Sequence, residues 1–284
     1  MTTEFRRQAI CTTWRARAVV ARAMVLTAAL CLTATAIGCA SAPPPGQPAG
    51  HPVATTPGRS TAQPTRATGA APGMPPAASC PAAPYGPRLY APGSSKTVAL
   101  TFDDGPGRST AAILAILARY RVTATFFNIG VAMVARPLLV REEVEGGYAM
   151  GDHTWNHPDM VPLSAAAQAA ELSKASAEQR SIAGTVPCAF RPPYGKYDAT
   201  TLRLAQQLQM GVWMWSVDTL DWTADGSDSS YWAQRIIRLA EQGGALQHPV
   251  VLMHDARPGD PATVAALSAI IQFFRSHGYR FVAL

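Results

Sequence analysis

The sequence predicts an α/β fold in which a mostly parallel sheet is covered by helices. From about residue 96 onward, short unbroken apolar runs alternate with longer amphipathic stretches, and strands that are apolar throughout are typical of parallel sheets covered on both faces. Seven strand–helix units favour closure into a barrel, although an open sheet fits the same pattern. In both architectures functional residues gather at the carboxyl ends of the strands.

The expected strands alternate with helical patterns along this part of the chain. The strand candidates are Thr97–Phe102, Ala124–Ile129, Tyr148–Met150, Ala189–Arg191, Gly211–Val217, Val250–His254 and Arg280–Ala283. Between them lie helical patterns such as Ser164–Ala183, Ala199–Gln209, Trp232–Gln242 and Ala262–Ser276. Ser164 and Gly184 bracket the first helix as caps, and Asp260-Pro261 predicts a cap and first-turn proline for the last.

The N-terminus has the pattern of an export signal. Residues 6–22 carry five Arg and no acid, and the apolar run Ala23–Gly38 follows; the run is short for a membrane span, which needs roughly 20 apolar residues. Its end, Ala36-Ile37-Gly38-Cys39, resembles a bacterial lipobox. We expect residues 1–39 to be a signal peptide with Cys39 lipidated. Cleavage without lipidation and a single-pass signal anchor are the alternatives.

Residues 40–80 predict a disordered linker. They contain ten Pro, no aromatic residue and no acid, so they cannot bury enough apolar surface to offset the entropy of ordering. The net charge of +6 also comes from the N-terminal part, because residues 1–80 hold seven Arg and one acid, whereas the 17 basic and 17 acidic residues of 81–284 cancel. The sequence therefore predicts no nucleic-acid partner for the folded domain, residues 81–284.

Two of the five cysteines fall in the folded part of the chain. Cys11 and Cys31 lie in the leader and Cys39 at the lipobox, which leaves Cys80 and Cys188. An even pair in an exported domain predicts a disulfide, and two free buried thiols are the alternative. No CxxC motif supports a zinc ribbon or a thioredoxin-type site.

Polar and ionisable residues follow five of the expected strands at their carboxyl ends. These clusters are Thr101–Pro106 (TFDDGP), His153–His157 (HTWNH), Arg191–Gly195 (RPPYG), Asp218–Trp222 (DTLDW) and Leu252–Asp255 (LMHD). Packing alone does not account for five such clusters at one end of a sheet. We therefore expect a functional site there.

The residue types in these clusters indicate metal-assisted hydrolysis of an amide or ester. His153 and His157 are four residues apart, which places both imidazoles on one side of a helical turn, and one carboxylate would complete a two-histidine, one-carboxylate site. The adjacent carboxylates of Asp103 and Asp104 repel each other, and a cation would relieve that cost. One acid could bind the metal and the other accept a proton from water, while His254 protonates the leaving group.

The five clusters, in this order, resemble the motifs of the polysaccharide deacetylases (NodB-type domains, carbohydrate esterase family 4). The resemblance covers about residues 96–284 and implies a distorted (β/α) barrel. It implies that Asp103 is the general base and that a divalent metal, usually zinc with cobalt and nickel as alternatives, is bound by Asp104, His153 and His157.

The same resemblance assigns the remaining site residues. Arg191 holds the base carboxylate, His254 is the catalytic acid, and Asp221 orients that histidine. The backbone N–H of Tyr194 binds the oxyanion, and Trp222 and Leu252 form the walls of an apolar pocket for the acetyl methyl group.

These expectations describe an exported, monomeric enzyme at the cell surface that removes acetyl groups from N-acetylglucosamine units. The leader and linker favour peptidoglycan as the polymer. Chitin oligomers and O-acetylated xylan are alternative substrates, and a non-catalytic glycan-binding lipoprotein is an alternative of a different class.

Overall fold

A computed structural model of the protein describes Cys80 and residues 84–284. The expected signal peptide, Cys39 and nearly all of the expected linker lie outside the described residues. Among the residues that are described, no helix is both long and apolar enough to cross a bilayer.

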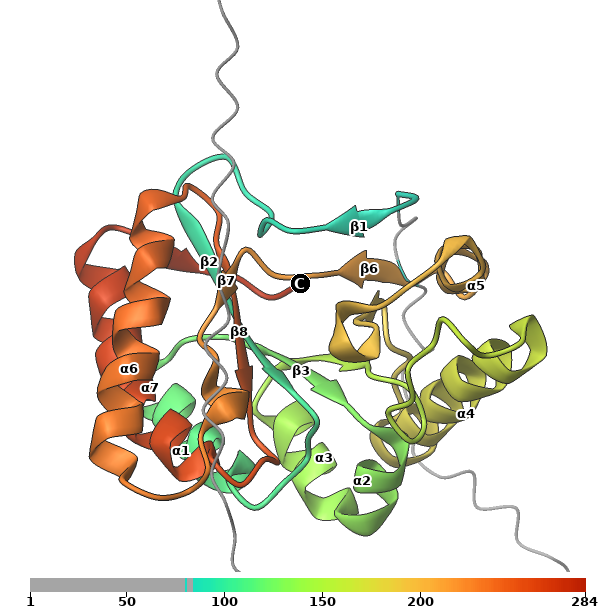
Figure 1. Cartoon of the computed structure of the whole chain (residues 1–284), viewed down its shortest axis with the longest axis horizontal. Coiled ribbons are helices and arrows are strands. Elements are labelled where there is room, and N and C mark those ends of the chain that lie inside the picture. Colours follow the sequence, from blue (N-terminus) through green and yellow to red (C-terminus); the bar gives the residue numbers. More distant parts are fainter. Residues whose placement is uncertain (1–79, 81–83) are drawn as a thin grey trace, which may run out of the picture. The chain divides into compact units, whose positions relative to one another are not determined.

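The strands form one sheet of nine, in the order β1-β6-β5-β4-β3-β2-β8-β7, and β9 pairs with β2. Every pairing between these strands is parallel. The sheet curls so that its strands surround the C-terminal end of the chain (Figure 1). The strands are β1 (Pro87–Arg88), β2 (Thr97–Asp103), β3 (Thr125–Asn128), β4 (Ala149–Asp152), β5 (Ala189–Phe190), β6 (Gly211–Trp213), β7 (Val217–Asp218), β8 (Val250–His254) and β9 (Arg280–Phe281).

One expected strand is divided between the two edges of the curled sheet. The apolar run Gly211–Val217 was expected as a single strand, which is wrong: β6 pairs with β1 and β5 at one edge of the sheet, whereas β7 pairs with β8 at the other. The backbone N–H of Met214 still donates to Arg88 at 2.8 Å, and that of Ser216 already donates to Val250 at 3.1 Å. The chain thus crosses from edge to edge, and the expected distorted (β/α) barrel is confirmed with nine strands instead of about seven.

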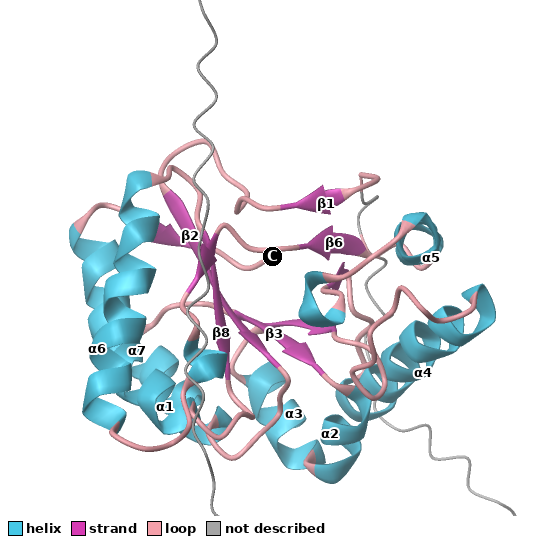
Figure 2. Cartoon of the chain, in the orientation of Figure 1, coloured by secondary structure: helices cyan, strands magenta, loops and turns pink. Residues whose placement is uncertain are grey.

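The helices lie outside the strands (Figure 2). Ser164 caps the long helix α4 by accepting a hydrogen bond from the Ala167 N–H, and Gly184 ends it at φ 71°, as predicted. Asp260 does not cap the last helix, because the N-cap is Gly259 and Asp260 lies in the first turn. The helices are α1 (Thr110–Tyr120), α2 (Gly130–Ala135), α3 (Pro137–Glu145), α4 (Ala165–Ala183), α5 (Ala199–Gln207), α6 (Ser229–Glu241) and α7 (Asp260–Ser276), with short 3-10 helices η1 (Pro193–Gly195), η2 (Asp221–Thr223) and η3 (Gln242–Ala245).

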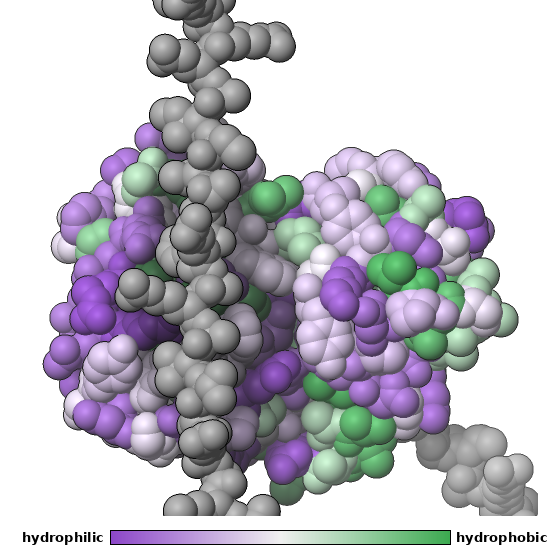
Figure 3. All heavy atoms as spheres, viewed as in Figure 1, coloured by the Kyte–Doolittle hydropathy of each residue, from purple (hydrophilic) through white to green (hydrophobic). Residues whose placement is uncertain are grey.

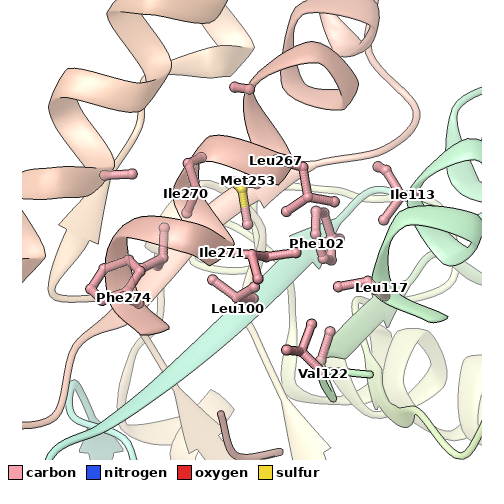
Figure 4. Packing of buried hydrophobic residues seen from close by; sticks show 14 of the residues in the cluster. Leu100, Phe102, Ile113, Leu117, Val122, Met253, Leu267, Ile270, Ile271 and Phe274 are labelled. Carbon is pink, nitrogen blue, oxygen red and sulfur yellow. The ribbon is translucent and has the colours of Figure 1, made fainter. Parts of the chain in front are cut away.

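The largest apolar core lies between the central strands and helices α1, α6 and α7. Leu100 and Phe102 of β2 and Met253 of β8 pack against side chains of α7 such as Leu267 and Ile271 (Figure 4). The visible outer surface on this helical side is mostly hydrophilic (Figure 3). This core fixes β2 and β8 against each other, and both strands end at the candidate site.

A disulfide joins Cys80 to Cys188, with the two Cα atoms 5.2 Å apart. Cys188 directly precedes β5, so the bond attaches the start of the described chain to the body of the barrel. This disulfide was predicted from the sequence, with two free buried thiols as the alternative.

Candidate active site

The parallel register of the two central strands brings the expected acid and base together. β2 and β8 pair so that Asp103 lies opposite His254, each as the last residue of its strand. Both side chains are buried. Residues that are far apart in the sequence therefore meet at the carboxyl end of the sheet, as the α/β pattern predicted.

His153 and His157 converge on Asp104, but not on a helical turn as expected. They lie in the loop that follows β4, where Thr154 and His157 adopt the left-handed backbone conformation with φ 71° and 61°. Asp104 also has a positive φ, 72°. The loop conformation, rather than helical periodicity, turns the two imidazoles toward each other, with ring centroids 4.9 Å apart.

These three side chains fit a divalent metal ion. Oδ1 of Asp104 lies 3.4 Å from Nε2 of His153 and 3.1 Å from Nε2 of His157, and ligand atoms 2.0–2.1 Å from one tetrahedral zinc ion are about 3.3 Å apart. Oδ1 is buried and accepts no hydrogen bond from the described residues. The three ligand atoms thus surround one position at which a divalent ion would be bound.

The orientation of His153 suits a metal ligand. Its Nδ1 lies 2.7 Å from the carbonyl oxygen of Arg191. Since a carbonyl only accepts hydrogen bonds, Nδ1 carries the proton, and the lone pair of Nε2 points toward Asp104.

Arg191 is fully buried and fixes Asp103. Its Nη1 donates to Oδ1 of Asp103 at 2.7 Å and to Oγ1 of Thr101 at 2.8 Å, and Nε and Nη2 donate to the carbonyls of Trp213 and Met214. The guanidinium also lies over the ring of Phe127. Every nitrogen of the guanidinium donates a hydrogen bond, so its position is fixed. It balances the charge of Asp103 through Oδ1 and leaves Oδ2 without a hydrogen bond from Arg191.

Asp221 holds His254 by two hydrogen bonds. Oδ1 faces Nδ1 of His254 at 2.8 Å, and Oδ2 accepts from its backbone N–H at 2.7 Å and from Oγ1 of Thr263 at 2.9 Å. Burial lowers the pKa of His254, but the Asp221 carboxylate, together with the charges of Asp103 and Asp104, outweighs it and raises this pKa to about 9. His254 is therefore protonated at neutral pH, with Nε2 free to donate.

A cavity of about 350 Å³ connects these groups. Tyr194 and Trp222 are about half exposed at its walls, and Leu252 of β8 is buried beneath it. Tyr194 has φ 58° and packs its ring edge-on against His157. The expected site residues that line the cavity are Asp103, His153, His157, Tyr194, Trp222, Leu252 and His254.

Two residues of the cavity lining, Arg257 and Trp215, lie outside the five expected clusters and were not assigned to the site. Arg257 lies three residues beyond His254, and its Nε donates to Oδ2 of Asp104. Trp215 lies in the crossover between β6 and β7, within reach of the Arg191 guanidinium. The sequence could not reveal Arg257, because it stands outside the motif in a loop whose course depends on tertiary contacts.

Two further carboxyls, each adjacent to a histidine of the site, are buried behind it. Asp152 accepts hydrogen bonds from the backbone N–H of Thr154 and from Oγ of Ser176, and Asp255 contacts Thr110. Burial raises the pKa of each to about 7. Their contacts support the loop that carries His153 and the end of β8 that carries His254, which is a structural role.

Comparisons with known proteins agree with this arrangement. A family model described as polysaccharide deacetylase matches residues 90–213. The peptidoglycan-N-acetylglucosamine deacetylase PgdA of Listeria monocytogenes is 34% identical over 192 residues, a match that covers 67% of this chain and 38% of the relative. The chain thus spans less than half the length of that protein.

A second relative and a solved structure match over nearly their whole length. A peptidoglycan-N-acetylglucosamine deacetylase of Bacillus cereus is 31% identical over 204 residues, covering 68% of this chain and 88% of the relative. The crystal structure of the Bc1960 peptidoglycan N-acetylglucosamine deacetylase aligns with a TM-score of 0.64 at 30% identity, covering 70% of this chain and 91% of that one. The chain therefore belongs to the polysaccharide deacetylase family, carbohydrate esterase family 4.

Proposed function

We propose that this protein is a metal-dependent deacetylase that hydrolyses the N-acetyl group of N-acetylglucosamine residues in peptidoglycan. One observation carries the proposal: Asp103 and His254, on adjacent strands, open into the same cavity beside the Asp104, His153 and His157 cluster. The relatives and the solved structure described above are named for this activity.

The chain's own residues account for the proton transfers of the reaction. Asp103, with Oδ1 held by Arg191, accepts a proton from water through Oδ2 as the water oxygen bonds to the acetyl carbon. His254 donates its Nε2 proton to the amide nitrogen as the carbon–nitrogen bond breaks, which releases acetate and a free amine. The backbone N–H of Tyr194 stabilises the developing oxyanion, and Trp222 and Leu252 enclose the methyl group.

Asp104, His153 and His157 would hold the divalent ion, which we propose to be zinc, with cobalt and nickel as competent substitutes. Such an ion supplies Lewis-acid polarisation of the carbonyl and a lowered pKa for water. The predicted leader and linker support action at the cell surface, by a lipid anchor on Cys39 in the favoured case.

An acetate-release panel tests the proposal. The chain is incubated with N-acetylglucosamine oligomers, peptidoglycan and O-acetylated xylan, with chelator, without it, and with zinc, cobalt or nickel restored. We expect release from peptidoglycan that chelator abolishes and metal restores, and no release from the matched Asp103→Asn variant. Release from xylan alone would identify an acetylxylan esterase, and release from oligomers alone a chitooligosaccharide deacetylase. Glycan binding without any release would identify a non-catalytic binder.

A further inference from the structure

Arg257 places a positive charge at the wall of the catalytic cavity. Among the described residues that line this cavity, it is the one Lys or Arg. Its side chain is 35% exposed, so the guanidinium is open to a bound molecule. The cationic side chain of Arg191, in contrast, is fully buried behind Asp103.

The backbone that carries Arg257 is fixed from three directions. Nη2 of Arg108 donates to the carbonyls of Arg257 at 3.1 Å and Pro258 at 2.6 Å, and the backbone N–H of Asp260 donates to the Arg257 carbonyl at 3.2 Å. Gly107 packs so closely that a Cβ atom there would lie 2.4 Å from Cα of Ala256. A fixed backbone reduces the entropy lost when the side chain binds a ligand.

The guanidinium retains hydrogen-bonding capacity. Its Nε donates to Oδ2 of Asp104, and neither Nη atom has a hydrogen-bond partner within the part of the chain that the structure describes. Two Nη groups on a planar guanidinium match the two oxygens of a carboxylate. The single charge of Asp104 does not neutralise both Arg257 and a divalent ion, so ion binding leaves this wall of the cavity positive.

We propose that Arg257 is a specificity-determining residue that binds a carboxylate of the glycan close to the reacting N-acetyl group. The pocket would then prefer acidic glycans, whose neighbouring sugar carries a carboxylic acid, to neutral ones of the same length. This inference rests on the proposed deacetylase function and names the substrate chemistry of that site. In peptidoglycan the carboxylate comes either from the lactyl ether of the neighbouring muramic acid or from its peptide stem.

The test compares oligomers that differ only in charge. The full chain is assayed on four-sugar peptidoglycan fragments with free lactyl carboxylates, on the same fragments with those groups converted to amides, and on fragments bearing peptide stems. Chitotetraose serves as the neutral reference. Arg257→Gln removes the charge, Arg257→Lys keeps it without the planar fork, and Lys196→Gln removes an exposed lysine that is paired with Asp159 and lies outside the cavity lining.

We expect the unsubstituted chain to show at least a tenfold higher kcat/KM on the acid than on the amide form. Arg257→Gln should bring this ratio close to one, Arg257→Lys should keep part of it, and Lys196→Gln should leave it unchanged. For the unsubstituted chain, the ratio of kcat/KM on the acid form to that on the amide form should also fall as salt is added. A higher kcat/KM on fragments that bear peptide stems than on stem-free amide fragments would show that Arg257 binds a carboxylate of the stem.

Binding to the Asp103→Asn protein with zinc bound, measured by calorimetry, provides a readout independent of turnover. The acid oligomer should bind more tightly than the amide, and Arg257→Gln should remove the difference. Equal affinity and equal kcat/KM for acid and amide forms, or an unchanged ratio in a folded Arg257→Gln protein, would overturn the inference. If that variant does not fold, the Lys variant and the salt dependence decide. Loss of acetate release from every glycan would instead refute the deacetylase function, while the binding comparison still tests Arg257.

Discussion

Arg191 binds Asp103 through one carboxylate oxygen and leaves the other facing the cavity. The Nη1–Oδ1 distance is 2.7 Å, whereas Oδ2 lies 3.8 Å from Nε2 of His153. The carbonyl of the same Arg191 faces Nδ1 of His153. One residue therefore sets the orientation of both the proposed base and a proposed metal ligand.

Arg191→Lys should lower kcat by at least about 100-fold, because a lysine cannot reach Asp103, Thr101 and two carbonyls at once. The effect should appear in kcat more than in KM, which steady-state kinetics on N-acetylglucosamine oligomers would measure. A lysine variant with wild-type kcat would show that Asp103 needs no fixed partner.

Substitutions of the two adjacent carboxylates, Asp103 and Asp104, should have different effects on metal binding. Asp104→Ala, like His153→Ala or His157→Ala, should weaken zinc binding and activity together, because these side chains converge on one point. Asp103→Asn should abolish turnover and keep the metal. Equal loss of zinc in Asp103→Asn and Asp104→Ala, measured by competition with a chelating dye, would show that the roles are divided wrongly.

The Asp221–His254 pair should set the alkaline limit of activity. The carboxylate raises the pKa of His254 to about 9, so the proton donor is charged below that pH and kcat/KM should fall as pH rises through it. Asp221→Asn removes the negative charge and should move this limb to lower pH and reduce kcat by about 100-fold or more. Thr263→Val removes a neutral hydrogen bond to the same carboxylate, so the limb should stay near its original pH. A pH–rate profile of the three proteins would decide.

Asp152 should make folding stability fall with rising pH. Burial raises its pKa from the ordinary 3.8 to about 7, so the folded state holds this proton more tightly than the unfolded chain does. That contribution is fully present below about pH 4 and is lost as pH rises through 7. Asp152→Asn stays neutral and can still bond to Thr154 and Ser176. It should be more stable than the unsubstituted chain at pH 8 by at least about 1 kcal/mol, or roughly 3 °C in Tm. Identical pH dependence of Tm in both would contradict this.

Removing the disulfide should destabilise the barrel without touching the site. Cys80 and Cys188 are 108 residues apart in the sequence, and a loop of that length contributes about 4–5 kcal/mol in the chain-entropy model. The Cys80→Ser, Cys188→Ser double variant should therefore lose several degrees of Tm in calorimetry while its kcat at 25 °C is retained. Unchanged Tm would show that the N-terminal attachment contributes nothing to stability.

Residue order alone predicted the fold class and the candidate site of this protein. Apolar strands alternating with amphipathic helices predicted a parallel α/β sheet. The types of side chain after each strand predicted a metal-assisted hydrolytic site at the carboxyl ends of the strands. These features are local, because strand patterns and strand ends are properties of short segments.

Tertiary structure decided the features that depend on contacts between distant segments. The run Gly211–Val217 has one continuous apolar pattern, yet hydrogen bonds to Arg88 and Val250 at opposite sheet edges divide it into two strands. The imidazoles of His153 and His157 meet through left-handed backbone in a loop, which no periodicity encodes. Arg257 reaches Asp104 only because β2 and β8 are in register. Such long-range pairings arise from burial and packing of the whole barrel, and a single stretch of sequence does not contain them.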